Sequence, residues 1–212
     1  MDQQFYLQDT RSTVGSNAVF WNKDCRGYGA NLDQLEVYTL ESAQSYHNSR
    51  NSDVPLLKSI VDELSILAVD CQYLPAPFTV DENDEYVIQR TGFWNGNDIL
   101  FLGRLGRSYN YEDAKIYSRS EADAYWNDRN MYSVFSKLSI DRISRRTFQA
   151  CNIDKRKMIS KPGIKLIKPK RVRPTTGKTR GNCPECGKIT WSYNPYEADY
   201  CAENSHPLSR AI

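Results

Sequence analysis

The sequence predicts an α+β protein made of two similar small units, a basic extended arm and a small C-terminal zinc-binding module. The same order of strand, turn and capped-helix signals occurs twice, at a spacing of 79 or 80 residues. The segment 155–181 then carries eleven basic side chains and no acidic one, and the last segment has cysteine and histidine spacing typical of zinc ligands. The predicted boundaries are 1–80, 81–154, 155–181 and 182–212.

The first unit begins with the signals of a hairpin. Residues 5–9 and 18–21 are rich in aromatic and aliphatic side chains, and the turn residues 15–17 separate them. Residues 35–38 alternate apolar and polar side chains, which is typical of a half-buried strand. Thr39 has the position of a helix N-cap, so we expect a helix over roughly the next two turns.

The end of the first unit is less regular. Asp53 precedes an apolar run and predicts a second helix over residues 54–64. Residues 68–73 favour a closing strand, and the prolines at 75 and 77 mark the joint to the second unit.

The second unit shows the same order of signals. Residues 85–89 and 99–101 are typical strands, and the turn residues 96–98 lie between them. Ser118 with Glu121 three positions later forms a capping box, which predicts the start of a helix.

Matched residues support an internal repeat. The matches are Tyr6 with Tyr86, Val19-Phe20-Trp21 with Ile99-Leu100-Phe101, Gly27 with Gly106, Asn31 with Asn110, Ala43 with Ala122, Lys58 with Lys137 and Asp62 with Asp141. We expect each unit to be a small antiparallel sheet with one helix across a face. Because units of about 80 residues bury little surface alone, we expect their cores to pack together as one pseudo-symmetric body.

Charge divides the chain more sharply than its net value of +2 suggests. Residues 1–154 have a net charge of −7, whereas the predicted arm is strongly basic. Such asymmetry often indicates contact with nucleic acid. The polar N-terminus and the absence of a long apolar run predict neither a secretion signal nor a membrane span. Cys25, Cys71 and Cys151 are scattered, which favours reduced thiols and a cytoplasmic location.

The basic arm is the main candidate for binding DNA or RNA. Its prolines and its alternation of lysine with isoleucine or leucine favour an extended backbone. The predicted nucleic-acid-binding residues are Lys155, Arg156, Lys157, Lys161, Lys165, Lys168, Lys170, Arg171, Arg173, Lys178 and Arg180. Such cations neutralise phosphates and release counterions but do not read sequence. An arm that binds an acidic protein, or a solvated linker, would have the same composition.

The C-terminal segment predicts a structural zinc site. The predicted Zn²⁺ ligands are Cys183, Cys186, Cys201 and His206, a set that closes a tetrahedral site. An apolar cushion for the module is expected from Trp191, Tyr193, Tyr196 and Tyr200. The alternative is a polar tail with reduced cysteines, but the segment has too few aliphatic residues to fold without a metal.

Signals for catalysis are weak. Gly177-Lys178-Thr179 lacks the earlier glycine, the strand and the helix of a phosphate-binding loop. Of the two histidines, His206 is assigned to zinc and His47 to an ordinary packing position. The acidic run 81–85 is interpreted as a solvated joint, and Asp62 and Asp141 as ion-pair partners of nearby lysines.

Exposed aromatic residues could also contact bases. Tyr28 beside Arg26, and Tyr109 beside Arg104 and Arg107, are placed on hairpin loops. The negative charge of residues 1–154 argues against this surface as the main site and fits a protein partner equally well.

One resemblance extends this interpretation. The segments that carry it are Tyr6-Leu7-Gln8-Asp9, Val14-Gly15-Ser16-Asn17, Phe20-Trp21-Asn22-Lys23, Gly27-Tyr28 and Val37-Tyr38-Thr39-x-Glu41. They resemble short uncharacterised proteins encoded by bacteriophages, over roughly residues 1–75 and, through the repeat, residues 76–150. The resemblance implies a phage accessory protein in the host cytoplasm that acts on host machinery or defence. It implies no activity, and the doubled unit and zinc tail depart from the short form.

The sequence therefore predicts a non-enzymatic protein that binds nucleic acid through its arm and a structural zinc module. The alternatives are a phage protein that inhibits a host enzyme or defence complex through residues 1–154, and a metal-dependent nuclease. DNA and RNA, the partner protein and the oligomeric state are not distinguished.

Overall fold

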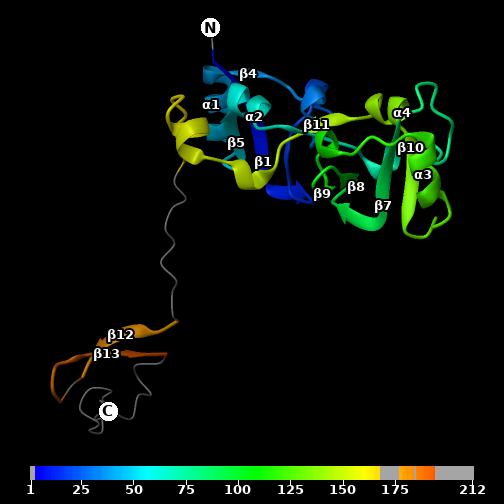
Figure 1. The fold of residues 1–212 in the computed structure, drawn as a ribbon. Coiled ribbons are helices and arrows are strands. Elements are labelled where there is room, and N and C mark those ends of the chain that lie inside the picture. Colours follow the sequence, from blue (N-terminus) through cyan, green and yellow to red (C-terminus); the bar gives the residue numbers. More distant parts are fainter. Residues whose placement is uncertain (1–2, 168–176, 184, 194–212) are drawn as a thin grey trace. The chain divides into compact units, whose positions relative to one another are not determined.

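The computed structural model describes residues 3–167, 177–183 and 185–193 (Figure 1). The chain divides into two compact units, residues 1–167 and residues 168–212. We call the first the body and the second the tail unit.

The first half of the body is a mixed arrangement of one antiparallel sheet and short helices. Its elements are β1 (Gln4–Val14), β2 (Asn17–Trp21), η1 (Lys23–Cys25), β3 (Tyr28–Gly29), η2 (Leu32–Gln34), β4 (Tyr38–Thr39), α1 (Leu40–Ser49), β5 (Asp53–Leu57), α2 (Lys58–Glu63), β6 (Ile66–Ala68) and η3 (Cys71–Tyr73). The sheet order is β3-β2-β1-β4, and β5 also pairs with β1. Gly15 turns the β1–β2 hairpin with a positive φ of 61°, and the Thr39 hydroxyl caps α1 as predicted.

The second half has the same class of structure. Its elements are β7 (Tyr86–Asn95), β8 (Asp98–Gly103), β9 (Gly106–Ser108), η4 (Tyr111–Asp113), α3 (Arg119–Trp126), β10 (Tyr132–Ser136), α4 (Lys137–Asp141), β11 (Arg145–Thr147), η5 (Ala150–Asn152) and the π-helical turn η6 (Arg156–Ser160). The sheet order is β10-β7-β8-β9. Ser118 and Glu121 form the predicted capping box at the start of α3. The body is therefore α+β, as the sequence predicts.

Several details of the predicted strands and helices are wrong. Residues 68–73 do not form a closing strand, because β6 ends at Ala68 and residues 71–73 form the turn η3. Of the strand expected over 35–38, only Tyr38 belongs to a strand, β4.

Residues 53–57 form strand β5 rather than the start of a helix, because Val54 to Leu57 pair with β1 and Leu56 becomes fully buried. A proline is tolerated there because β1 is the strand partner of β5 and no second strand needs the missing N–H. The helix begins only at Lys58.

The register of the two hairpins also differs from the predicted matches. Phe20 lies opposite Gln8 and Phe101 lies opposite Gln89, so these hairpins correspond at a spacing of 81 residues. The spacing returns to 79 residues at α1 and α3. The reason is that the loop between β2 and β3 is longer than the loop between β8 and β9.

Each half contributes a segment to the other half's sheet. β6 and β11 pair antiparallel, with Leu67 opposite Arg146 at the centre. Beyond this pair, the amide of Ala18 donates to the carbonyl of Phe148 at 2.9 Å, and the amide of Ile99 donates to Val69 at 3.1 Å. The chain therefore crosses from each half into the other in the same manner.

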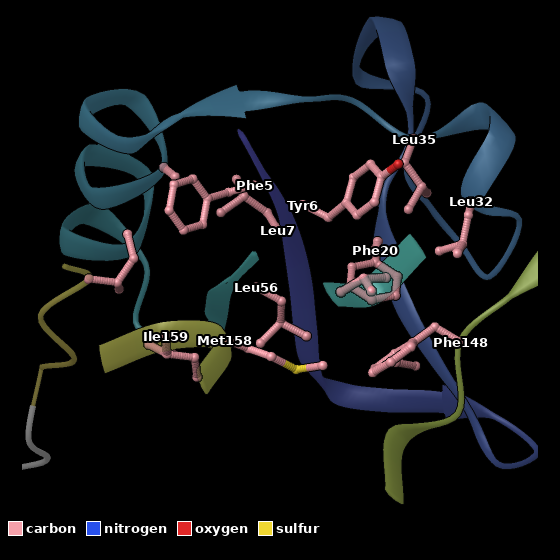
Figure 2. Close-up of a cluster of buried hydrophobic side chains, with 14 residues drawn as sticks. Phe5, Tyr6, Leu7, Phe20, Leu32, Leu35, Leu56, Phe148, Met158 and Ile159 are labelled. Atoms are coloured by element: carbon pink, nitrogen blue, oxygen red, sulfur yellow. The ribbon is translucent and has the colours of Figure 1, made fainter. Parts of the chain in front are cut away.

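The hydrophobic cores follow this exchange. Phe148, which comes from the second half, is fully buried in the first-half cluster around Phe20 (Figure 2). Val69, which comes from the first half, is buried in the second-half cluster around Phe101. Neither core is complete without residues of the other half, because a buried aromatic or β-branched side chain contributes a large part of a small core.

Candidate nucleic-acid interface

Nearly half of the predicted arm, residues 155–167, belongs to the body. Met158, Ile159 and Ile164 are buried in the first-half core, where Figure 2 shows Met158 and Ile159 beside Leu56. We call residues 155–167 the arm root. Figure 1 shows this yellow segment beside α1 and β5.

The predicted extended backbone is wrong for residues 156–160, which form the turn η6. The carboxylate of Asp154 accepts hydrogen bonds from the amides of Arg156 at 2.9 Å and Lys157 at 3.1 Å. These bonds satisfy amides at the start of the turn and lower the pKa of Asp154. The turn then places Met158 and Ile159 side by side on the core.

Two side chains of α1 hold the end of the arm root. The amide of Gln44 accepts from the Lys165 N–H at 2.8 Å and donates to the Lys165 carbonyl at 3.0 Å. One turn later, His47 Nε2 lies 3.1 Å from the N–H of Ile167. The side chains therefore pair with the backbone as a neighbouring strand would.

His47 has a larger structural role than the sequence indicated. Its ring is buried, and Nδ1 lies 2.8 Å from the carbonyl oxygen of Asp53. Because a carbonyl oxygen only accepts, Nδ1 carries the proton and donates. Nε2 is then free of a proton and accepts from Ile167, so the neutral ring joins β5 to the arm root. A charged ring would lose this acceptor. The signal available in the sequence was one α1 face that carries both Gln44 and His47, three positions apart.

The cations of the arm root point to solvent. The five basic residues of this segment are exposed: Lys155, Arg156, Lys157, Lys161 and Lys165. Among the described residues, the recorded ion pair of this group is Lys157 with Asp154, at 3.8 Å and largely exposed. A pair of this kind in water contributes little and leaves most of the positive charge available.

The other predicted nucleic-acid-binding residues lie elsewhere. Lys168, Lys170, Arg171 and Arg173 lie outside the described residues. Lys178 and Arg180 belong to the tail unit, where Arg180 is on β12 (Thr179–Asn182).

The tail unit contains a hairpin with a cysteine knuckle at its tip. β12 pairs antiparallel with β13 (Ile189–Ser192). Between them, the amide of Cys183 donates to the carbonyl of Lys188 and the amide of Gly187 donates to Cys183, both at 2.8 Å. Gly187 has a positive φ of 71°, which this tight turn requires.

The knuckle brings two of the four predicted zinc ligands into one turn. Cys183 is buried and Cys186 is exposed. Cys201 and His206 lie outside the described residues, and the described part of the chain contains no cluster of three or more potential metal ligands. Two thiolates on one turn can provide half of a tetrahedral site. Trp191 and Tyr193 do not form the expected cushion, because both are exposed, and Tyr196 and Tyr200 lie outside the described residues.

Three acidic residues that the sequence singled out make contacts within the body. Asp62 pairs with Lys58, and Asp141 pairs with Lys137 at 2.8 Å, which confirms the predicted ion pairs. The run 81–85 is not uniformly solvated, because Asp81 is buried and accepts hydrogen bonds from the Ser136 hydroxyl and from backbone amides. Burial alone would raise the pKa of Asp81, but these hydrogen bonds lower it below its usual value.

One charged cluster has no clear signal in the sequence. The guanidinium of Arg145 lies 3.0 Å from Asp70 and 2.8 Å from Asp98, where the two halves meet. Burial raises the pKa of Asp98, although Asn17 and Arg145 hold the charged form. A cleft of about 510 Å³ lies beside Arg145 and is also lined by Tyr73 and Arg142. The three charged residues come from separate elements, so only the fold brings them together.

The aromatic residues predicted on hairpin loops are not open stacking surfaces. The ring of Tyr28 lies 4.6 Å from that of Trp21, and the guanidinium of Arg11 lies 5.5 Å above it. Tyr109 is partly buried. The faces of Tyr28 are therefore occupied within the body.

None of the helices described here is both long and apolar enough to cross a membrane. Comparisons with protein-family models, with curated proteins and with solved structures found no match to this chain.

Proposed function

We propose that this chain is a non-enzymatic protein that binds nucleic acid through its basic arm, with a zinc-stabilised tail unit. The observation that carries the proposal is the arm root. Its side chains Met158, Ile159 and Ile164 are buried in the body, whereas its five cations are exposed. A plain solvated linker would not need this attachment.

Attachment of the root favours binding in physical terms. A cation on an anchored backbone loses less conformational entropy when it meets a phosphate than one on a free chain. Each neutralised phosphate also releases counterions, so binding by this segment depends steeply on salt. The net charge of −7 on residues 1–154 repels phosphate and concentrates contact on the arm.

Zinc is the proposed cofactor of the tail unit. The hydrogen-bonded knuckle around Cys183 and Cys186 supports it, because both thiols belong to one tight turn. Cys201 and His206 are the proposed remaining ligands. In this role the metal stabilises the fold of a segment that has few aliphatic side chains.

We further propose that the two halves of the body are a duplicated unit. Corresponding helices α1 and α3 begin 79 residues apart, and both halves exchange segments by matching hydrogen bonds. The duplication supplies a rigid base for the arm root.

Fluorescence anisotropy tests the nucleic-acid proposal. Full-length protein is titrated into labelled single- and double-stranded DNA and RNA at several salt concentrations. A root variant replaces Lys155, Arg156, Lys161 and Lys165 with glutamine. The matched control removes four exposed body cations in the same way: Lys23, Arg26, Arg104 and Arg107.

The root variant should bind nucleic acid more weakly. Its plot of log binding constant against log salt concentration should also be shallower, by about 0.9 for each lost phosphate contact with duplex DNA. The control should retain the slope. Equal slopes for wild type and root variant would refute the role of the root. Absence of binding by the wild-type protein at low salt would refute the function itself.

A second candidate is binding of a host protein by the acidic body, as the resemblance to phage proteins implies. The supporting observation is a group of stacked aromatic and arginine side chains. Phe78 lies 4.7 Å from Trp126, Arg119 lies 4.1 Å from the same indole, and Arg129 lies 4.9 Å from Phe78. Aromatic and arginine residues are enriched in protein interfaces. Affinity capture from host lysate should use residues 1–167, because an earlier end would remove core residues of the arm root. A specific partner whose retention survives high salt and requires Trp126 would favour this candidate.

A further inference from the structure

The tail hairpin has one face that combines aromatic and cationic side chains in two rows. Ile189 and Trp191 of β13 point to the same side because side chains alternate along a strand, and Tyr193 directly follows the strand at the same spacing. These three side chains are 47%, 58% and 74% exposed, whereas the intervening Thr190 and Ser192 are less exposed. Monomeric domains seldom leave three large apolar residues exposed in a row.

The second row comes from β12. The strand register places Asn182 opposite Ile189 and Arg180 opposite Trp191. Directly opposed residues of an antiparallel pair lie on the same face. Lys178 continues this row, and its ammonium lies 5.5 Å from the centre of the Tyr193 ring. The face therefore places a cation beside each of the two aromatic rings, and neither β12 nor β13 contains an acidic residue.

We propose that this face is a stacking platform for single-stranded nucleic acid. The inference rests on the proposed function and names the polymer that the tail unit prefers. Aromatic side chains stack on the faces of bases regardless of sequence, and neighbouring cations hold the phosphates. A protein partner fits less well, because a row of cations lies directly beside the apolar row and no carboxylate on the two strands offers a complementary pair.

The spacing of the rings favours a single strand over a duplex. Two residues along a strand span about 6.6 Å, so Trp191 and Tyr193 lie about twice as far apart as the axial rise of about 3.4 Å between successive nucleotides of B-DNA. Bases that meet both rings must be separated from each other. In a duplex the base faces are covered by their neighbours, whereas an extended single strand exposes them.

Other aromatic residues of the chain are less suited to this role. Trp21 donates its indole N–H to Asp53 at 2.9 Å, and Trp126 is covered by Arg119. Trp191 has no such fixed contact recorded within the described part of the tail unit, and it has a cation opposite it on the neighbouring strand.

Binding of single strands to tail variants tests the platform. Full-length wild type and the variants Trp191→Ala, Trp191→Leu and Trp191→Phe are titrated by anisotropy against a labelled mixed-sequence single strand and its duplex. The matched control is Tyr73→Ala, which removes an aromatic residue from the body that is 67% exposed. Metal content of each variant, measured after release from the denatured protein, reports whether the tail unit is intact.

Wild type should bind the single strand more tightly than the duplex. Trp191→Ala and Trp191→Leu should each weaken single-strand binding by about tenfold, and Trp191→Phe should retain most of it. Leucine keeps apolar volume but has no π face. Single-strand binding that is retained in Trp191→Phe and lost in Trp191→Leu therefore identifies stacking. Duplex binding and the Tyr73→Ala control should change little.

Three results would overturn the inference. The first is tighter binding of the duplex than of the single strand. The second is an unchanged single-strand affinity of Trp191→Ala. The third is an equal single-strand affinity of Trp191→Leu and Trp191→Phe. In each of these cases the proposed function survives, because the wild type still binds. If the wild type binds neither form at low salt, the proposed function fails and the platform fails with it.

Discussion

Because the two halves exchange segments, we expect Phe148, a residue of the second half, to stabilise the core of the first half. Phe148→Ala removes a fully buried ring from the first-half cluster. The ring of Phe148 lies 6.3 Å from that of Phe20 at an angle of 60°, an edge-on contact of the favourable kind. Truncation of such a side chain costs about 3–5 kcal/mol, which is a large fraction of the stability of a small body.

Urea denaturation and hydrogen exchange measured by mass spectrometry provide the assay. Because the cores are shared, protection should fall by a similar amount in peptides that cover 17–21 of the first half and 98–103 of the second half. The matched control is Leu105→Ala, also in the second half, whose side chain is 105% exposed and should cost little. Loss of protection in only one half, or two separate unfolding transitions in the wild type, would refute the reasoning.

Three further predictions follow from individual contacts. His47→Ala should lower the free energy of unfolding by about 1–3 kcal/mol, because it leaves the carbonyl of Asp53 and the N–H of Ile167 without their buried partner. Hydrogen exchange should show the loss of protection first in the arm root. Unchanged protection of the Ile167 amide would contradict the contact. Asp81→Asn should destabilise the body at neutral pH, and the difference should shrink in acid. The folded-state pKa of Asp81 is lowered, so its contribution is complete above the unfolded value of about 3.9 and is lost as the pH falls through the folded value; a pH-independent difference in chemical denaturation would exclude this origin. Zinc should be present at about one ion per chain, should be lost in Cys186→Ser, and its removal by a chelator should unfold the tail unit without changing body stability; retention of a full complement of metal in Cys186→Ser would contradict the ligand assignment.

The parts of the body that the sequence predicts correctly are those controlled by local chemistry. Thr39 and Ser118 cap helices because their hydroxyls reach nearby backbone amides, and such contacts need only a few adjacent residues. Gly15 and Gly96 turn their hairpins for an equally local reason, a positive φ.

The errors arise where a distant segment decides the conformation. Residues 53–57 pair with β1, which lies more than forty positions earlier in the chain, and that pairing replaces the helix expected from Asp53. Met158 and Ile159 looked like isolated apolar residues in a basic arm, because nothing near them in the sequence shows the core that receives them.

The candidate site shows the same difference between local contacts, which the sequence predicts, and contacts between distant segments, which it does not. The spacing of Cys183 and Cys186 predicted a knuckle, and the structure describes a tight turn there. The anchoring of the arm root by Gln44 was not predicted, because both partners are polar and 121 positions apart. The same distance in sequence hid the Arg145 cluster, whose members meet only after both halves have folded.

The crossing of the chain at β6 and β11 has a consequence for assembly. The connection between the halves is not what holds them together, because each half is bound to the other by ladder hydrogen bonds and by a borrowed core residue. Cleavage of the joint between η3 and β7 should therefore leave a nicked but associated body. Under the proposed duplication, an ancestral chain with a single half would be an obligate dimer in which each molecule supplies its last strand to the other. Fusion of two such genes would place both halves in one polypeptide and allow them to diverge, and the different residues Leu67 and Arg146, which face each other where the halves pair, fit that history.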